Sequence, residues 1–245
     1  MATLFQETAP LPSVVKICPF VQRVTALLEA KNVPYEVVYI SLSNKPKWFL
    51  DISPHGQVPL LLTQSGTALF ESDAIVEYID EVSEPIEPGI SAEQKAIDRA
   101  WSYMATKNYL YQCSTMRSAD KASLEQRAEK LSKIFAKAET ALTQQAHQGP
   151  YFKGGMLSNV DIAWLPLLHR AHIIFKHTGY NLLAGNPKVI LWQQGIMQTS
   201  IPQKSVSADF ENAFSSFYLS KDTYLGNFED CPSNIDRCNQ SQCCK

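Results

Sequence analysis

The chain of 245 residues lacks the features that mark several large classes of protein. No uninterrupted apolar stretch approaches the ~18 residues of a membrane span, and the best candidate, IAWLPLLHRAHIIF, is broken by His169, Arg170 and His172. Basic residues (22) nearly balance acidic ones (24), and no dense basic run is present. We therefore expect neither a membrane nor a nucleic acid as partner.

The first residues, MATLFQETAPLPS, lack the basic segment of a secretory signal and contain Glu7, Pro10 and Pro12. We therefore expect no such signal and a cytoplasmic location. In that compartment the six cysteines are expected to be reduced thiols rather than a disulfide framework.

Cys18 has no second cysteine nearby, since the motif is C-P-F-V and not C-x-x-C. It lies between residues 13–17 (SVVKI), which predict a short strand, and a helical pattern that starts at Pro19. The amides and the dipole of a helix N-terminus favour negative charge, so we expect this thiol to ionise more easily than a free cysteine. A lone thiolate should form a mixed disulfide with a small thiol and be released by a second molecule of that thiol. The alternative is a buried structural cysteine.

The first eighty residues alternate between predicted strands and helices. The helix from Pro19 has Val21, Val24 and Leu28 on one face, while Gln22 and Arg23 suit the other. Further elements are predicted as a strand at 35–42, a short helix within 44–53, strands within 57–63 and 68–70, and a helix capped by Ser72. This order predicts a small α/β domain with a mixed sheet.

Beyond a linker at 83–91, only helical patterns remain. Ser91 with Gln94 and Ser158 with Asp161 are predicted to form capping boxes, the latter a structural feature. We therefore expect an α/β domain at 1–82, a helical domain at 92–226 and a flexible cysteine-rich tail at 227–245.

Three features beside Cys18 suit a short peptide with charged ends. Val58 precedes a proline at a strand start, where a cis-proline would expose its backbone to an extended peptide. Glu71 and Ser72 at a helix N-terminus suit a carboxylate and an amine, and Lys45 offers a cation for a second carboxylate. Glutathione is a peptide with this arrangement of groups around a central thiol.

The motifs ICPF, NKPKWF, GQVPLL, ESDAIVEYID and SNVDIAW together resemble the cysteine-type glutathione transferases. The omega class is the most similar, with the dehydroascorbate reductases close to it, and the likeness runs from about residue 13 to about residue 226. It implies a thioredoxin-like N-terminal domain, an all-α C-terminal domain and a homodimer.

The resemblance also implies roles for individual residues. Cys18 would be the nucleophile that forms the mixed disulfide, with the backbone of Phe20 near the glutathione sulfur. Lys45 would hold the glycyl carboxylate and Val58 the cysteinyl backbone, while Glu71 and Ser72 would hold the γ-glutamyl end.

Aromatic residues of the second half are candidates for the second-substrate pocket, with the core as the alternative. They are Trp101, Tyr109, Trp164 and Tyr111.

Four cysteines lie outside the resemblance, at Cys231, Cys238, Cys243 and Cys244. They fit solvated thiols without a role, resolving thiols that reach Cys18 or a neighbouring subunit, or ligands of a soft metal. Their spacing matches no common zinc pattern, so no metal site is predicted.

The predicted function is a glutathione-dependent thiol transferase or reductase that works through a Cys18–glutathione mixed disulfide. Its candidate substrates are glutathionylated proteins, small disulfides, dehydroascorbate and S-conjugates. One alternative is a non-catalytic or membrane-associating relative, because residues 18–23 (CPFVQR) also resemble the chloride intracellular channel proteins. The other is a conjugating transferase, although a hydroxyl that leaves the glutathione thiolate free serves conjugation better.

Overall fold

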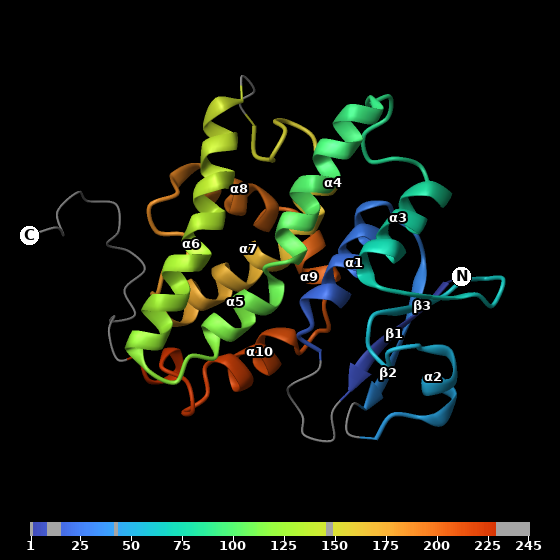
Figure 1. The fold of residues 1–245 in the computed structure, drawn as a ribbon, viewed down its shortest axis with the longest axis horizontal. Helices are drawn as coiled ribbons and strands as arrows, with labels where there is room; N and C mark the ends of the chain where they lie inside the picture. Colours follow the sequence, from blue (N-terminus) through green and yellow to red (C-terminus); the bar gives the residue numbers. More distant parts are fainter. Residues whose placement is uncertain (1, 9–15, 42–43, 146–148, 229–245) are drawn as a thin grey trace, which may run out of the picture.

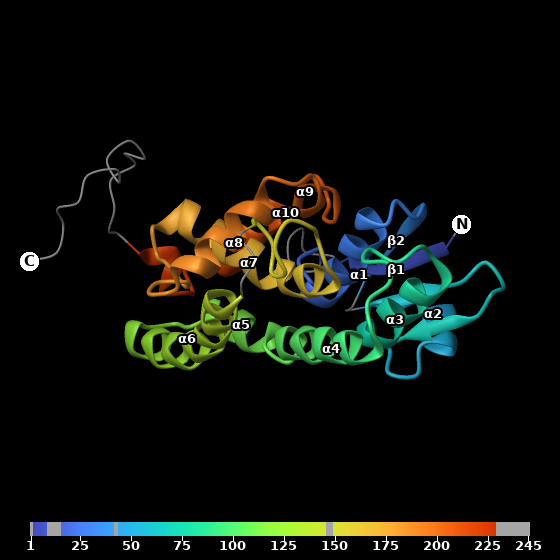
Figure 2. The same cartoon turned by 90° about the horizontal axis from the view of Figure 1, so that it is seen from above.

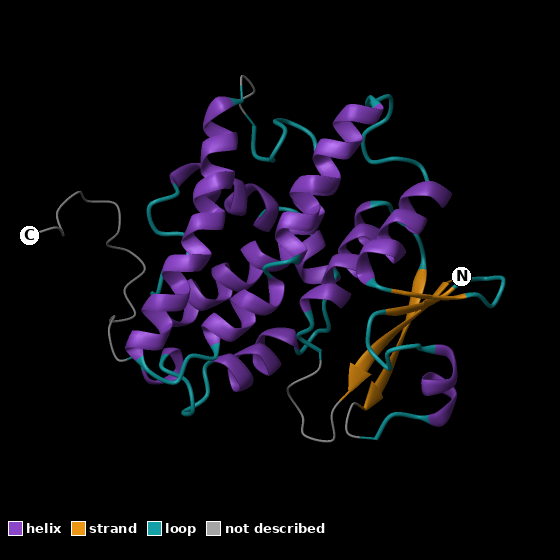
Figure 3. Ribbon diagram, viewed as in Figure 1, coloured by secondary structure: helices purple, strands orange, loops and turns teal. Residues whose placement is uncertain are grey.

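The computed structural model describes residues 2–8, 16–41, 44–145 and 149–228. A small sheet with its helices forms one end of the molecule, and helices alone form the other (Figures 1 and 3). This is the thioredoxin-like plus all-α architecture that the sequence predicted. Within the described residues, no helix is both long and apolar enough to cross a bilayer.

The sheet has the strand order β2-β1-β3-β4. Strand β1 (Ala2–Thr8) runs parallel to β2 (Tyr35–Ser41) and antiparallel to β3 (Leu60–Leu62), which pairs in turn with β4 (Ala68–Phe70). The predicted strand at 35–42 and the predicted strand pair are thus confirmed. The sheet is mixed, as expected.

The prediction of a first strand at residues 13–17 is wrong for its described part. Lys16 and Ile17 form a turn, whereas residues 13–15 lie outside the described residues. The β-branched pattern reflects burial instead, because Ile17 is a core residue. Its carbonyl accepts a hydrogen bond from the side chain of Arg170, at 2.6 Å, in place of a strand partner.

Helices cover both faces of the sheet. Helix α2 (Lys47–Ile52) contributes Phe49, which packs with Leu60 in a small cluster. The next residue, Leu61, points to the opposite face and joins the main core with α1 (Pro19–Ala30) and α3 (Ser72–Val82). Helix α1 therefore lies between the sheet and the helical end (Figure 1).

The helical end is built in two layers, best seen from above (Figure 2). One layer holds α4 (Ala92–Thr106), α5 (Tyr109–Met116) and α6 (Lys121–Gln144). The other holds α7 (Asn159–Thr178), α8 (Pro187–Met197), α9 (Ile201–Lys204) and α10 (Phe210–Tyr218), before a 3-10 turn at Leu225–Asn227. Helix α7 contacts α1, α4 and α8, so it joins the two ends of the molecule.

The predicted caps differ in outcome. Ser158 and Asp161 form the expected capping box. The Ser91 hydroxyl accepts from the Gln94 amide, but the Gln94 side chain donates to Asp98 at 2.8 Å, so this box is only half formed. Ser72 is the first helical residue of α3 rather than its cap, and no side chain caps that helix.

Asp161 has a larger role than a cap. One of its oxygens accepts from the Phe152 amide at 2.8 Å and from the Trp192 indole at 2.6 Å. The other accepts from the amide and the hydroxyl of Ser158, at 2.7 and 2.6 Å. The fully buried carboxylate thus joins the start of α7 to α8 and to the loop that precedes α7.

We expect Asp161→Asn to lower the free energy of unfolding by about 2–4 kcal/mol, because an amide NH₂ would face two buried donors. Urea titration followed by far-UV circular dichroism measures this loss. Asp120→Asn is the matched control, since Asp120 caps α6 through Ser123 but is exposed. Equal midpoints for the two variants would contradict the structural role of Asp161.

Candidate active site

Cys18 is the N-cap residue of α1, and Pro19 occupies the first helical position, as the sequence predicted. The Cys18 backbone is extended, with φ −67° and ψ 122°. The Cys18 side chain accepts no capping hydrogen bond, but the nearby backbone N–H groups of Val21 and Phe20 act to lower the pKa of its thiol. The Cys18 side chain is half-buried.

The predicted effect on ionisation is wrong. Burial raises the pKa of the Cys18 thiol, and this exceeds the lowering by the Val21 and Phe20 amides and by the charge of Arg170. The reason is the position of α1, which packs against α7 of the helical end, so the thiol has only partial access to water. The pKa of Cys18 therefore lies above that of a free thiol.

A cavity of about 150 Å³ lies beside the first turn of α1. Four of the predicted glutathione-binding residues line it together: Phe20, Val58, Glu71 and Ser72. The peptide bond between Val58 and Pro59 is cis, as expected. Residues distant in sequence thus meet on one surface next to the Cys18 turn.

The α3 side of this cavity suits an anion. Glu71 precedes the helix with a positive φ of 67°, which non-glycine residues rarely adopt. Ser72 is buried at the first helical position, and no side chain caps the amides of the first turn. Those amides and the helix dipole can bind a carboxylate, while the Glu71 carboxylate can bind an amine.

Lys45 lies at the other side, outside the residues that line the cavity itself. Lys45 lies beside Gly56: its ammonium nitrogen is 3.7 Å from the position that the Cβ atom of any other residue at position 56 would occupy. Gly56 is in the turn between His55 and Gln57, which both line the cavity. None of the ion pairs found between described residues involves Lys45, so its charge is available to an anion.

Sequence reasoning assigned no binding role to six other residues that line the cavity. They are Ser53, His55, Gln57, Pro59, Phe70 and Leu110. The first three precede the cis-proline in the segment SPHGQVP, so proximity to Val58 was a usable signal. Leu110 is an exposed leucine of α5, and no sequence pattern distinguishes it from a surface residue.

The prediction that Tyr109 and Trp164 line a substrate pocket is wrong, because both are fully buried in the core. The Trp164 indole donates to the Trp101 carbonyl at 3.0 Å, and the Tyr109 hydroxyl donates to the Ala163 carbonyl. Trp101 is half-buried and borders a different cavity, with Phe152. Tyr111 is half-buried and packs against the core.

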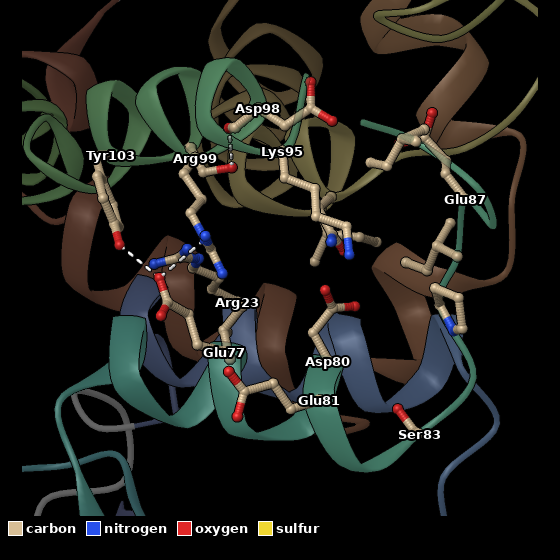
Figure 4. Close-up of a pocket in the computed structure, with 17 residues that line it drawn as sticks. Arg23, Glu77, Asp80, Glu81, Ser83, Glu87, Lys95, Asp98, Arg99 and Tyr103 are labelled. Carbon is tan, nitrogen blue, oxygen red and sulfur yellow. Dashed lines mark hydrogen bonds and ion pairs between the residues drawn. The ribbon is translucent and has the colours of Figure 1, made fainter. Parts of the chain in front are cut away.

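A second cavity, of about 370 Å³, lies between α3 and α4 (Figure 4). One of its carboxylates is satisfied by groups that line the same cavity: Glu77 accepts from Tyr103 at 2.7 Å and pairs with Arg99 at 3.3 Å. None of the predicted site residues lines it. No cluster of three potential metal ligands occurs in the described part of the chain, and the four tail cysteines lie outside that part.

Comparisons with known proteins agree with this geometry. The N-terminal domain model of glutathione S-transferases matches residues 17–82, and the C-terminal domain model matches residues 107–206. The probable cytosolic glutathione S-transferase DHAR1 of Oryza sativa subsp. japonica is 32% identical over 68% of this chain and 72% of its own length. The chain belongs to the glutathione S-transferase family. The resemblance inferred from the sequence motifs is thereby confirmed.

Other glutathione S-transferases place it more closely within the family. Glutathione S-transferase omega-1 of Sus scrofa is 29% identical over 83% of both chains. The dehydroascorbate reductase structure of Chlamydomonas reinhardtii matches with a TM-score of 0.62 and 25% identity, over 88% of this chain and 95% of that one. The rice glutathione transferase GST1, solved with glutathione, shares the fold with a TM-score of 0.72 at 20% identity, over 91% of this chain and 98% of that one.

We expect iodoacetamide to alkylate Cys18 of this transferase with a midpoint more alkaline than that of free glutathione in the same assay. Burial keeps the thiol protonated at neutral pH, and the thiolate is the form that reacts. Peptide mapping after timed quenching isolates the Cys18 rate from those of the other cysteines. An acidic midpoint would show that the amides and Arg170 outweigh burial.

Proposed function

We propose that this glutathione transferase is a thiol transferase or reductase whose nucleophile is Cys18. The observation that carries the proposal is a thiol at the N-cap of α1, where the Val21 and Phe20 amides favour the thiolate, with no second cysteine in the motif C-P-F-V. The cavity beside its turn supports the choice of glutathione as co-substrate.

In the proposed binding mode, each part of glutathione meets one element. The γ-glutamyl carboxylate lies at the uncapped N-terminus of α3, beside Ser72, and its amine faces Glu71. The cysteinyl backbone pairs with Val58. The glycyl carboxylate lies towards Lys45 and the Gly56 turn. The amide of Phe20 remains near both sulfur atoms.

The proposed reaction has two exchanges of sulfur. The Cys18 thiolate attacks the glutathione sulfur of a glutathionylated substrate, so a mixed disulfide forms and the substrate leaves as a thiolate that takes up a proton. The thiolate of a second glutathione then attacks the mixed disulfide. Oxidised glutathione leaves and the Cys18 thiolate returns. Two molecules of glutathione supply the electrons when the substrate is a small disulfide or dehydroascorbate.

The raised pKa of Cys18 sets the pH dependence of this reaction. Only a minority of molecules carry the thiolate at neutral pH, although a thiolate of higher pKa is the stronger nucleophile. The rate of the first exchange should therefore increase with pH until the thiol has ionised. The Phe20 and Val21 amides offset part of the cost of the buried negative charge.

We further propose the domain division at 1–82, 83–91 and 92–226, a homodimer, and a cytoplasmic location. In support of the division, α3 ends at Val82 and α4 begins at Ala92. The plant relative that is named as cytosolic supports the cytoplasmic location, whereas another plant relative is named as chloroplastic.

We expect Cys18→Ser to reduce deglutathionylation and dehydroascorbate reduction by about a hundredfold or more, because the hydroxyl cannot form the mixed disulfide. Coupled assays of glutathione oxidation measure both rates. Intact mass after exposure to oxidised glutathione should show an adduct that maps to Cys18. Equal rates for the two proteins would refute the assignment, and conjugation of a chlorinated aromatic that survives Cys18→Ala would favour the conjugating alternative.

We expect Lys45→Met to raise KM for glutathione about three- to tenfold with little change in kcat, because a half-exposed cation contributes only modestly to binding. Lys47→Met is the matched control from the same segment. Lys47 pairs with Asp51 on the exposed side of α2, at 2.8 Å, and its loss should leave KM unchanged. A KM that rises equally in both variants would indicate nonspecific loss of positive charge.

A further inference from the structure

Arg170 is a buried cation that pairs with no anion in the described part of the chain. It comes from α7, and none of its surface is exposed. Its side chain contacts neutral groups: the carbonyls of Ile17 and Pro166, the Gln22 side chain, and the ring of Phe210 at 5.7 Å. Among the described residues, no carboxylate forms an ion pair with it, and its buried Nε has no hydrogen-bond partner. A buried charge ordinarily has a counter-ion, so this one requires an explanation.

The guanidinium holds the segment that carries Cys18 from two sides. Nη2 donates to the carbonyl of Ile17, the residue before Cys18, at 2.6 Å. Nη1 donates to Oε1 of Gln22 at 2.5 Å. The backbone N–H of Gln22 in turn donates to the Cys18 carbonyl at 3.1 Å, as the first hydrogen bond of α1. Arg170 thus contacts the residues on both sides of the nucleophile.

Arg170 fixes the orientation of the Gln22 amide, and His169 accepts from it. Burial, followed by the charge of Arg170, lowers the pKa of His169 to about 3, so its ring is neutral at physiological pH. Gln22 Nε2 lies 2.9 Å from His169 Nδ1. Since a guanidinium only donates, Oε1 must face Arg170 and Nε2 must donate to His169. The chain His169–Gln22–Arg170–Ile17 therefore has one consistent set of donors and acceptors.

The groups that act electrostatically on the Cys18 thiol come from several elements. Its own α1 supplies the Phe20 and Val21 amides, α7 supplies Arg170, and α5 supplies Cys113. Tyr109 of α5 and Tyr218 of α10 also lie within electrostatic range of Cys18. Arg170 is the one cation in this set, and its charge lowers the pKa of the thiol whereas Cys113 raises it.

We propose that Arg170 is a positioning residue for Cys18, which holds the Ile17 carbonyl and Gln22 so that the sulfur faces the α1 amides and which acts as the uncompensated counter-ion of the thiolate. The inference rests on the proposed function only for its kinetic consequence. The missing counter-ion of Arg170 is then the nucleophile itself, in its reactive form.

The test compares Arg170→Met and Arg170→Lys with wild type in two assays. In Arg170→Met the Cys18 alkylation midpoint should move about one pH unit further alkaline. Arg170→Lys, which keeps the charge but loses the planar fork, should show a smaller shift in the same direction. In deglutathionylation, kcat at neutral pH should fall about tenfold, with KM for glutathione within about twofold because Arg170 does not line the cavity.

Arg117→Met is the matched control. Arg117 also donates to a backbone carbonyl, that of Phe217 at 2.7 Å, and lies 4.5 Å from the Phe217 ring, but it is not among the groups that shift the pKa of Cys18. It should leave the midpoint unchanged. If circular dichroism shows that Arg170→Met is unfolded, the same two assays are made on Arg170→Lys and Gln22→Met instead.

The proposal is overturned if folded Arg170 variants keep the wild-type midpoint within about 0.2 pH units, or if Arg117→Met shifts it equally. Failure of the proposed function would look different. Wild type would then lack deglutathionylation, while the alkylation profile would still depend on Arg170.

Discussion

The packing of α1 between the sheet and α7 is the constraint on which the rest of this structure depends. A helix at a protein surface can leave its polar side chains in water, but α1 cannot, and Gln22 and Arg23 are only 2% and 3% exposed. Each must therefore find a protein partner. Gln22 bonds to α7, and Thr25 donates to the Ser205 carbonyl at 2.7 Å. The polar side of α1 thus becomes the connection between the two ends of the molecule.

The same packing determines the electrostatics of the site. A helix N-terminus stabilises a thiolate best when the thiol keeps its contact with water, because then the amides act without a desolvation cost. At Cys18 the packing of α1 against the helical end removes much of this contact with water, and the cost of burying the charge exceeds the contribution of the amides. A cation inside the protein is the remaining means of stabilising the thiolate. Arg170 supplies that charge from α7. The helical end therefore both buries the thiol, which disfavours the thiolate, and provides a positive charge that favours it.

Whether a feature could be predicted from the sequence depended on whether neighbouring or distant residues determine it. Features set by neighbouring residues were found: Cys18 before Pro19 at a helix start, the cis Val58–Pro59 bond, and the Ser158–Asp161 capping box. Features set by distant contacts were not. The apolar segment before Cys18 looked like a strand because burial and strand pairing select the same residues. The predictions for the aromatic residues were wrong for a related reason, since the sequence does not distinguish a tyrosine or tryptophan in a pocket from one in a core.

The distance between the parts of the site also depends on α1, through a contact that no local sequence pattern reveals. Arg23, one turn beyond Cys18, is bonded to Asp73 in the first turn of α3. Asp73 directly follows Ser72, so the two helix N-termini that would hold the sulfur and the γ-glutamyl carboxylate are attached to one another through a buried guanidinium. Any movement of α3 that widened the cavity would have to break this pair, and Arg23 would then lose its partner in a place with almost no access to water. The distance between the nucleophile and the carboxylate site is therefore a property of α1 and not of the loops around it.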